Sequence, residues 1–365
     1  MKPKPHIVNL PVYKPGKPIE EVKKEYGLDE VIKLASNENP YGSSPSAKAA
    51  IQAELDQLSL YPDGSAAELT AALAAHLGVN AENIIFGCGS DEIIALIARA
   101  FFLPGDETIM ADQTFSVYKS NADIERAVSI EVPLVQGTHD LDGMLARVTD
   151  KTKVIWVCNP NNPTGTFVPE SALTAFLDAV PDRVMVVLDE AYYEYATDSS
   201  YSNGIKLLER YPNLVVLRTF SKIYGLAALR IGYGVASPEI ITLINQVREP
   251  FNTSRLAQAA ALAALGDREY VEECRRLNSA GLVQLQDEFK RLGLEYFPSQ
   301  GNFIMVDVRV PAFDIFELLL RKGVIVRAGH RLYPTWIRVT VGSQEQNKVF
   351  IQALEAALQE QGVQA

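Results

Sequence analysis

Cysteine and histidine are scarce in this chain: its 365 residues include only three cysteines and four histidines. Cys88, Cys158 and Cys274 lie far apart and have no metal-ligand spacing, so we expect neither a disulfide framework nor a bound metal. A sparse and odd number of cysteines is typical of proteins in a reducing cytosol. The composition therefore predicts a cytoplasmic protein.

Long apolar runs are also missing. The most apolar window, residues 93–103, is short and is interrupted by Arg99, whereas a membrane-spanning helix needs about 20 predominantly apolar residues. The first residues, M-K-P-K-P-H-I-V-N-L, contain lysines but no apolar segment of the secretory type. We therefore predict that no membrane is among the partners.

Positive charge is in deficit, with a formal net charge of −11 at pH 7. Nucleic-acid binding leaves a basic patch or stripe in a sequence, and none offsets this acidic balance, so no nucleic-acid partner is expected. A local group of arginines can still bind a small anion. The hydrophobic share of 47% and the charged share of 22% are those of an ordinary globular protein.

The order of patterns predicts an α/β protein with three regions. Residues 1–44, rich in proline, glycine and lysine, predict an extended arm with a short helix over 18–26. Residues 45–253 alternate apolar runs with helical patterns, which predicts a large domain with a mainly parallel sheet covered on both faces. Residues 254–365 predict a smaller α+β domain that the arm joins. The expected strands are 83–86, 108–110, 154–157, 184–188, 214–217, 231–235, 303–307, 324–327 and 336–341.

The most informative segment is T-F-S-K-I-Y-G-L-A-A-L-R-I-G-Y, residues 219–233. Lys222 comes just after a buried strand, where partial desolvation lowers the pKa of an amine and makes it usable for imine chemistry. Arg230, with the hydroxyls of Thr219 and Ser221, offers several donors to a phosphate. A lysine imine and a phosphate clamp are what pyridoxal 5′-phosphate requires. A surface lysine and an arginine in an ion pair are the alternative.

Polar residues follow several of the other predicted strands. Ligands of open parallel sheets bind at the carboxyl ends of the strands. Ser90 and Asp91 open a helix after G-C-G, where backbone N–H groups can bind phosphate, although a plain capped turn fits equally well. Asn162, in N-P-N-N-P-T-G, can donate to a phenolate oxygen. Asp189 can pair with a pyridinium nitrogen, or it can cap a helix.

Four more residues are candidates for the same site. Tyr192 can share the phenolate oxygen with the asparagine just described. Phe115 can stack on a pyridine ring, although one aromatic residue in such a place is more often part of a core. Arg327 and Arg338 lie at short strands in the last third of the chain, and guanidinium groups prefer carboxylates and phosphates. A lone arginine is usually part of a surface ion pair, so each arginine alone is weak evidence for a substrate site.

Together these segments resemble the fold-type I pyridoxal-phosphate aminotransferases, and among them those that act on histidinol phosphate. Six motifs match in order along nearly the whole chain: L-A-S-N-E-N-P-Y-G, Y-P-D-G, G-C-G-S-D-E, N-P-N-N-P-T-G, D-E-A-Y and S-K-I-Y-G-L-A-A-L-R-I-G-Y. Each motif is weak alone, but their common order is specific. Gln113, Ala228 and Trp336 depart from the family pattern, and the bulk of Trp336 could reshape the substrate pocket.

The resemblance implies a role for each candidate. Lys222 would hold the cofactor through an imine and then move a proton, with Asp189 and Tyr192 completing the catalytic set. The cofactor would contact Ser90, Asp91, Phe115, Asn162, Asp189, Tyr192, Thr219, Ser221, Lys222 and Arg230. The substrate would contact Tyr13, Arg327 and Arg338. Tyr61 would reach the cofactor phosphate of a second subunit, so a homodimer is expected.

The implied activity is transamination of L-histidinol phosphate with 2-oxoglutarate, which gives imidazole acetol phosphate and glutamate in histidine biosynthesis. Arg338 would bind the phosphate in one half-reaction and the α-carboxylate of glutamate in the other. Three alternatives stay open: a tyrosine or phenylalanine transaminase, alone or as a second activity, a decarboxylase of a phosphorylated amino acid, and the sensor half of a transcription regulator. Residues 1–44 are too short and proline-rich for a helix-turn-helix domain, which disfavours the regulator.

Overall fold

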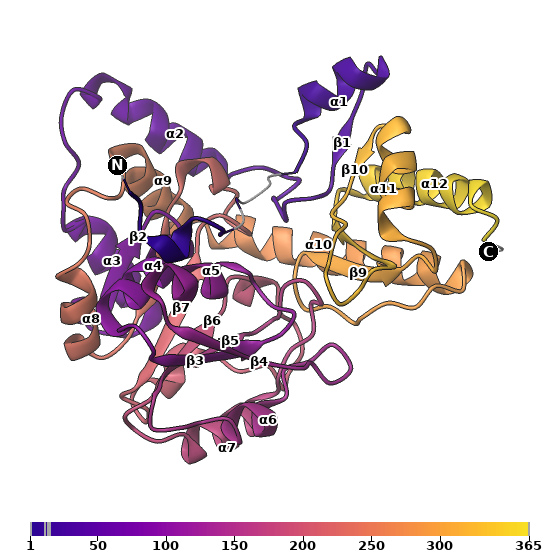
Figure 1. Ribbon diagram of the computed structural model, residues 1–365. Coiled ribbons are helices and arrows are strands. Elements are labelled where there is room, and N and C mark those ends of the chain that lie inside the picture. Colours follow the sequence, from indigo (N-terminus) through magenta and orange to yellow (C-terminus); the bar gives the residue numbers. More distant parts are fainter. Residues whose placement is uncertain (1, 11, 13–15, 364–365) are drawn as a thin grey trace.

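The chain forms two groups of secondary structure joined by one long helix. The computed structural model describes residues 2–10, 12 and 16–363. This part of the chain contains a seven-stranded sheet of order β2-β8-β7-β6-β5-β3-β4 and two two-stranded sheets, β11-β9 and β1-β10. The long helix α10 (Arg268–Arg291) runs from the large sheet to the smaller group (Figure 1).

The seven-stranded sheet is mainly parallel. Its strands are β2 (Ile84–Gly87), β3 (Glu107–Ala111), β4 (Val128–Val132), β5 (Thr152–Cys158), β6 (Met185–Asp189), β7 (Leu214–Thr219) and β8 (Gly232–Val235). Strand β8 runs antiparallel to β2 and β7, and the other neighbours are parallel. Parallel strands are buried on both faces and therefore read as continuous apolar runs. The predicted α/β architecture is confirmed.

Helices cover both faces of this sheet. Successive residues of a strand point to opposite faces, so in β5 Trp156 belongs to one core and Val157 to the other. The core that contains Trp156 is covered by α4 (Ser90–Phe101), α5 (Val117–Glu125) and α8 (Pro238–Asn245). The opposite core is covered by α2 (Pro45–Glu54), α3 (Ala67–Leu77), α6 (Leu141–Leu145), α7 (Glu170–Ala179) and α9 (Arg255–Gly266). Short 3₁₀ turns lie at Pro5–Ile7, Leu55–Gln57, Ala81–Asn83, Tyr193–Tyr195, Gly204–Leu207 and Ala227–Leu229.

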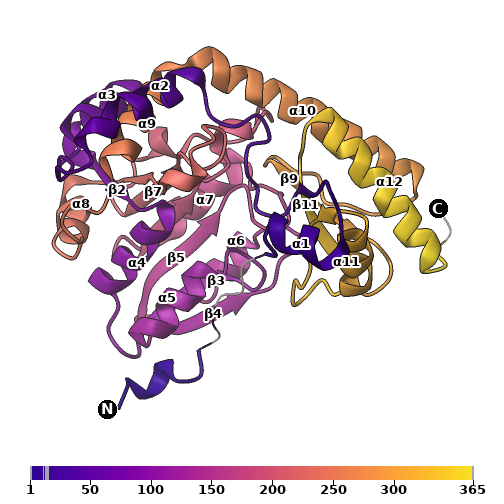
Figure 2. The ribbon, with the colours of Figure 1, turned by 90° about the horizontal axis from the view of Figure 1, so that it is seen from above.

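The smaller group has a core of its own, built on the antiparallel strands β9 (Phe303–Asp307) and β11 (Trp336–Thr340). Helices α11 (Ala312–Arg321) and α12 (Gln344–Glu360) pack with α10 around it. The N-terminal segment joins this group, because β1 (Ile32–Lys33) pairs in parallel with β10 (Val324–Ile325). Helix α1 (Ile19–Tyr26) lies beside α11 (Figure 2).

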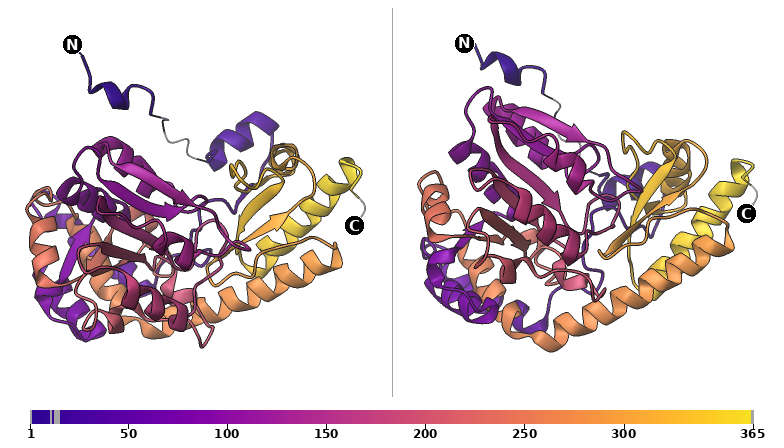
Figure 3. Two further views of the ribbon diagram at one scale, coloured as in Figure 1. Left: turned by 60° about the horizontal axis from the view of Figure 1, so that its bottom comes forward. Right: turned by 90° about the horizontal axis from the view of Figure 1, so that it is seen from below.

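The domain ranges 1–44, 45–253 and 254–365 stay a prediction. Helix α9 lies beyond residue 253, yet it packs against α2, and its buried alanines belong to the core of the large sheet. Helix α10 passes along both groups, so the packing changes from one core to the other within that helix (Figure 3). None of the helices in the described ranges is both long and apolar enough to cross a lipid bilayer.

Gly225 lets the loop after β7 pack closely against the backbone of Gly42. Its φ is +68°, and a Cβ there would overlap the carbonyl group of Gly42. We expect Gly225→Ala to lower the free energy of unfolding by about 3 kcal/mol or more, since backbone strain and a clash combine. Gly78→Ala is the matched control, because Gly78 has φ +72° and no atom lies within 4 Å of the position that a Cβ would take; it should lose only about 1–2 kcal/mol. Urea unfolding compares them, and equal losses would contradict the clash.

Candidate active site

The polar residues at the carboxyl ends of the strands meet in one cavity of about 830 Å³. This volume is typical of small-molecule sites. The predicted residues that line the cavity are Ser90, Asp91, Phe115, Asn162, Asp189, Tyr192, Thr219, Ser221, Lys222, Arg230, Arg327 and Arg338. Tyr61 lies at a separate surface hollow, and Tyr13 lies outside the residues that the structure describes.

Lys222 presents an amine to this cavity from the loop that follows β7. The Nζ atom lies 5.6 Å from the centre of the Tyr192 ring. Burial lowers the pKa of Lys222 from its ordinary 10.5, and the positive charge of Arg338 adds to this effect, so that the pKa is about 8. An amine is nucleophilic only when it is neutral. A substantial fraction of Lys222 is therefore reactive at mildly alkaline pH.

Asp189, the last residue of β6, is a buried carboxylate with 2% of its surface exposed. Its Oδ2 accepts a hydrogen bond of 2.6 Å from the Tyr118 hydroxyl, and its Oδ1 accepts one of 3.1 Å from the Ala191 N–H. Burial raises the pKa of Asp189 to about 6, against the opposing effect of the Tyr118 hydrogen bond. A buried carboxylate is costly unless a cation pairs with it, so this site suits a protonated ring nitrogen.

Tyr118 is a site residue that sequence reasoning missed. It is fully buried on α5 and stacks on Trp156, with ring centres 4.9 Å apart. The Trp156 Nε1–H donates to the Thr108 hydroxyl at 2.8 Å, which fixes the indole. Tyr118 follows Phe115 by about one helical turn, and the two rings meet edge to face. The three-residue spacing from Phe115 could have pointed to Tyr118. It does so only if the segment is known to be helical, because residues three apart are neighbours on a helix.

A cluster of donors lies where α4 begins. The first N–H groups of a helix have no partner within it, and Ser90 is the first residue of α4, preceded by Gly89 at φ +76°. The Arg230 guanidinium lies beside this turn and donates to the Ser221 hydroxyl at 3.3 Å. A Cβ on Gly89 would come within 2.6 Å of Arg230 Nη2. Glycine at position 89 therefore leaves room for the Arg230 guanidinium next to the first backbone N–H groups of α4.

The backbone around Thr219 and Gly232 also packs closely against this turn. Thr219 Oγ1 accepts from the Ser221 N–H at 3.0 Å, which fixes the start of the lysine loop. A Cβ on Gly232 would lie 2.5 Å from the Ser90 backbone nitrogen. Ser90, Thr219, Ser221 and Arg230 all line the cavity, so backbone N–H groups, two hydroxyls and one guanidinium are available to a ligand there. These donors fit a phosphate group.

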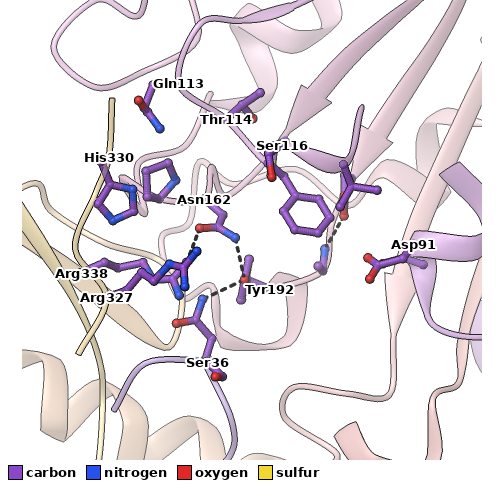
Figure 4. Close-up of a pocket in the computed structure, with 18 of the residues that line it drawn as sticks. Ser36, Asp91, Gln113, Thr114, Ser116, Asn162, Tyr192, Arg327, His330 and Arg338 are labelled. Atoms are coloured by element: carbon purple, nitrogen blue, oxygen red, sulfur yellow. Dashed lines mark hydrogen bonds between the residues drawn. The ribbon is translucent and has the colours of Figure 1, made fainter. Parts of the chain in front are cut away.

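Asn162 and Tyr192 belong to one hydrogen-bonded network that also contains Asn37. The Tyr192 hydroxyl accepts from Asn37 Nδ2 at 2.9 Å and from Asn162 Nδ2 at 3.4 Å, and Arg338 Nη1 donates to Asn162 Oδ1 at 2.6 Å (Figure 4). Burial raises the pKa of Tyr192 far above its ordinary range, so its proton remains available for donation. Asn37 was missed because its motif, L-A-S-N-E-N-P-Y-G, precedes the strands of the large sheet, and the candidates were sought at the ends of those strands.

Arg327 and Arg338 come together through the backbone. The Arg327 N–H donates to the Arg338 carbonyl at 3.0 Å, and the Arg338 N–H donates back at 2.8 Å. Both guanidinium groups therefore point to the same side of the cavity (Figure 4).

Two residues that depart from the family pattern have clear contacts. The large Trp336 ring packs against Phe297, on which it stacks with ring centres 4.5 Å apart. Gln113 lines the cavity, and its Oε1 accepts from the Leu332 N–H at 3.3 Å.

The fold and this cavity define a pyridoxal-phosphate-dependent transferase of fold type I. Residues 29–354 match the model of aminotransferase class I and II, and the chain belongs to that family. The resemblance found in the sequence, and the predicted aminotransferase class, are confirmed.

Three relatives illustrate the similarity. The chain is 56% identical over 356 residues to the histidinol-phosphate aminotransferase of Brevibacillus brevis, which covers 97% of this chain and 98% of the relative. It is 53% identical over 360 residues to that of Bacillus subtilis, with coverages of 98% and 100%. Its fold matches that of the histidinol-phosphate aminotransferase from Sinorhizobium meliloti in complex with pyridoxal-5′-phosphate, with a TM-score of 0.91 at 29% identity and coverages of 98% and 97%.

Asp189 is expected to destabilise the cofactor-free protein at neutral pH. Its folded pKa of about 6 lies above the unfolded value of about 3.9, so folding disfavours the ionised form. This effect is absent below pH 4, develops between pH 4 and 6 and reaches roughly 3 kcal/mol above that. We expect Asp189→Asn to raise the thermal stability of the cofactor-free protein at pH 8 and to leave it nearly unchanged at pH 3.5.

The same variant should hold pyridoxal phosphate at least tenfold more weakly, since one charge-assisted hydrogen bond is lost. Equilibrium dialysis measures this. Asp198→Asn is the control, because Asp198 is exposed and the hydrogen bonds that it accepts from Ser200 lower its pKa instead of raising it. An equal gain in stability at both pH values would show that the charge of Asp189 is not responsible.

Proposed function

We propose that this chain is a transaminase that transfers the amino group of L-histidinol phosphate to 2-oxoglutarate, a step of histidine biosynthesis, in the cytoplasm. One observation carries the proposal: the Lys222 amine, the buried Asp189 carboxylate and two guanidinium groups face a single cavity. The lysine and the carboxylate serve a pyridoxal cofactor, and the two guanidinium groups serve an anionic substrate. The full-length similarity to histidinol-phosphate aminotransferases supports the choice of amine.

Each residue around the cofactor would have a separate role. Pyridoxal phosphate, when bound, supplies an aldehyde for imine formation and a ring that withdraws electrons. Arg230 and the turn at Ser90 bind its phosphate, and Asp189 keeps a negative charge at its ring nitrogen. The Lys222 Nζ, with a pKa of about 8, would take a proton from the substrate Cα and deliver it to the cofactor carbon C4′. Tyr192 donates to the phenolic oxygen.

Arg327 and Arg338 orient the substrate. Histidinol phosphate carries a phosphate, and glutamate carries carboxylates, so one pair of guanidinium groups can hold each in turn. A ping-pong exchange needs such a shared clamp, because both amines react in the same place. Tyr13 remains a predicted substrate contact.

Half-reaction rates test the choice of substrate. We expect the visible absorption of the bound cofactor to bleach with L-histidinol phosphate at least about a hundredfold more efficiently than with tyrosine or phenylalanine, a difference of roughly 2.7 kcal/mol in transition-state binding. The reverse order would assign the chain to aromatic amino acids. Release of carbon dioxide without any need for 2-oxoglutarate would make it a decarboxylase.

Lys222→Ala is expected to give a folded protein that retains the phosphate contacts but does not turn over. The amine that forms the imine and moves the proton is gone, while the donors around Ser90 and Arg230 remain. Lys206→Ala, at an exposed lysine on a 3₁₀ turn, is the control and should keep full activity. Steady-state turnover decides, and a Lys222→Ala rate within tenfold of the parent would mean that another lysine performs the chemistry.

A homodimer belongs to the proposal. Tyr61 is 79% exposed, stacks on Phe251 at 4.8 Å and lies away from the cavity of its own chain. Its neighbours Leu58, Leu60 and Phe251 are 62%, 56% and 46% exposed, and a group of exposed apolar side chains is typical of an interface. A second copy of the chain would cover this group and would receive the Tyr61 hydroxyl at its cofactor phosphate.

Mixed dimers test the role of Tyr61. Tyr61→Phe should weaken cofactor retention by roughly 1.5–3 kcal/mol, the value of one charge-assisted hydrogen bond, without unfolding the subunit. Mixing Tyr61→Phe with inactive Lys222→Ala subunits creates one site with both an intact lysine and an intact tyrosine. Activity at limiting cofactor should then exceed that of Tyr61→Phe dimers. No increase, with subunit exchange verified, would leave Tyr61 as an ordinary turn residue.

A further inference from the structure

His330 presents an unpaired nitrogen to the part of the cavity that Arg327 and Arg338 line. Its Nε2 is buried, and no hydrogen-bond partner for it exists among the residues that the structure describes. The side chain lines the cavity, and Figure 4 shows the ring close to Arg327 and Arg338. Buried polar atoms nearly always have partners in folded proteins. An unpaired one at the wall of a cavity indicates that a ligand atom completes it.

The charge state of His330 narrows the choice of ligand. Burial lowers its pKa, the positive charges of Arg338 and Arg327 lower it further, and the pKa is about 3. The ring is therefore neutral at working pH and offers one N–H donor. A neutral donor next to two guanidinium groups adds a hydrogen bond to an anion without adding a third positive charge.

The loop that carries His330 is held in place from the large sheet. Arg331 Nη2 lies 3.3 Å from Glu131 Oε1, and the Leu332 N–H donates to Gln113 Oε1 at 3.3 Å. Glu131 lies on β4, and Gln113 follows β3. These contacts hold the loop across the cavity, so that His330 is positioned in the free enzyme.

We propose that His330 is a substrate-binding residue whose Nε2–H donates to the phosphate group held by Arg327 and Arg338. The inference rests on the proposed function, because it assumes that the amine carries a phosphate monoester. Such a phosphate has three free oxygens spread around phosphorus, so three donors on different sides can each bind one oxygen, whereas a carboxylate has only two oxygens in one plane. His330 therefore favours the phosphorylated amine over glutamate and over unphosphorylated amines.

Two substitutions separate the hydrogen bond from the shape of the ring. His330→Phe keeps a flat ring and removes the N–H donor, and His330→Gln restores a neutral N–H donor. His76→Gln, at an exposed histidine on α3, is the control. For each holoenzyme, kcat and KM are measured with L-histidinol phosphate and with unphosphorylated L-histidinol, and the cofactor absorption and Tm verify folding.

We expect His330→Phe to raise the KM for L-histidinol phosphate by about tenfold or more, with kcat within about twofold of the parent. Its kcat/KM for L-histidinol should be unchanged, and His330→Gln should recover most of the affinity. If His330→Phe does not fold, His330→Ala takes its place with the same expectation. An unchanged KM, or an equal loss with both amines, would overturn the role in phosphate binding. A parent enzyme without activity on L-histidinol phosphate would instead refute the proposed function, and the inference with it.

Discussion

One guanidinium group sets the geometry of the whole site. Arg338 Nη2 donates to the Ala35 carbonyl and Nη1 donates to Asn162 Oδ1, each at 2.6 Å. Thr340, on the same strand, exchanges hydrogen bonds with Asn37. Short hydrogen bonds from a charged donor are among the strongest in proteins. They join the N-terminal segment, the large sheet and the smaller sheet at one point, so the width of the cavity depends on this junction.

With the proposed substrate in place, Arg338 would also link substrate binding to the reactivity of Lys222. Its positive charge contributes to the lowered pKa of Lys222, and its guanidinium faces the space where the substrate anion is proposed to bind. An anion at Arg338 would offset part of that charge. Arg338, which we propose orients the substrate, thus also lowers the pKa of the Lys222 amine. The raised pKa of Asp189 shows that its buried carboxylate has no positive partner in the chain that offsets burial, and we propose that the cofactor ring supplies that positive charge.

The sequence predicted the central sheet well and its periphery poorly. Strands β5, β6 and β7 are continuous apolar runs, but β4 (V-S-I-E-V) alternates with polar residues at the edge of the sheet and was not predicted. Helix α5 has few apolar positions, and without it Tyr118 could not be placed next to Asp189. Residues that follow the strands closely, such as Lys222, could be placed at the cavity from sequence because ligands bind at the carboxyl ends of parallel strands. Asn37 and His330 lie at the site only because of tertiary packing, and a local sequence pattern does not predict such packing.

The pairing of β1 with β10 has a consequence for how the protein is made. Ile32 pairs with Val324, its neighbour across 292 residues of chain. At a synthesis rate of about 5–20 residues per second, the early strand leaves the ribosome roughly 15–60 seconds before its partner exists. During that interval the N-terminal segment has no sheet to join, and Ala35 and Asn37 have no Arg338 or Thr340 to bind. The active site of this chain is therefore among the last features to form during translation, after the large sheet is complete.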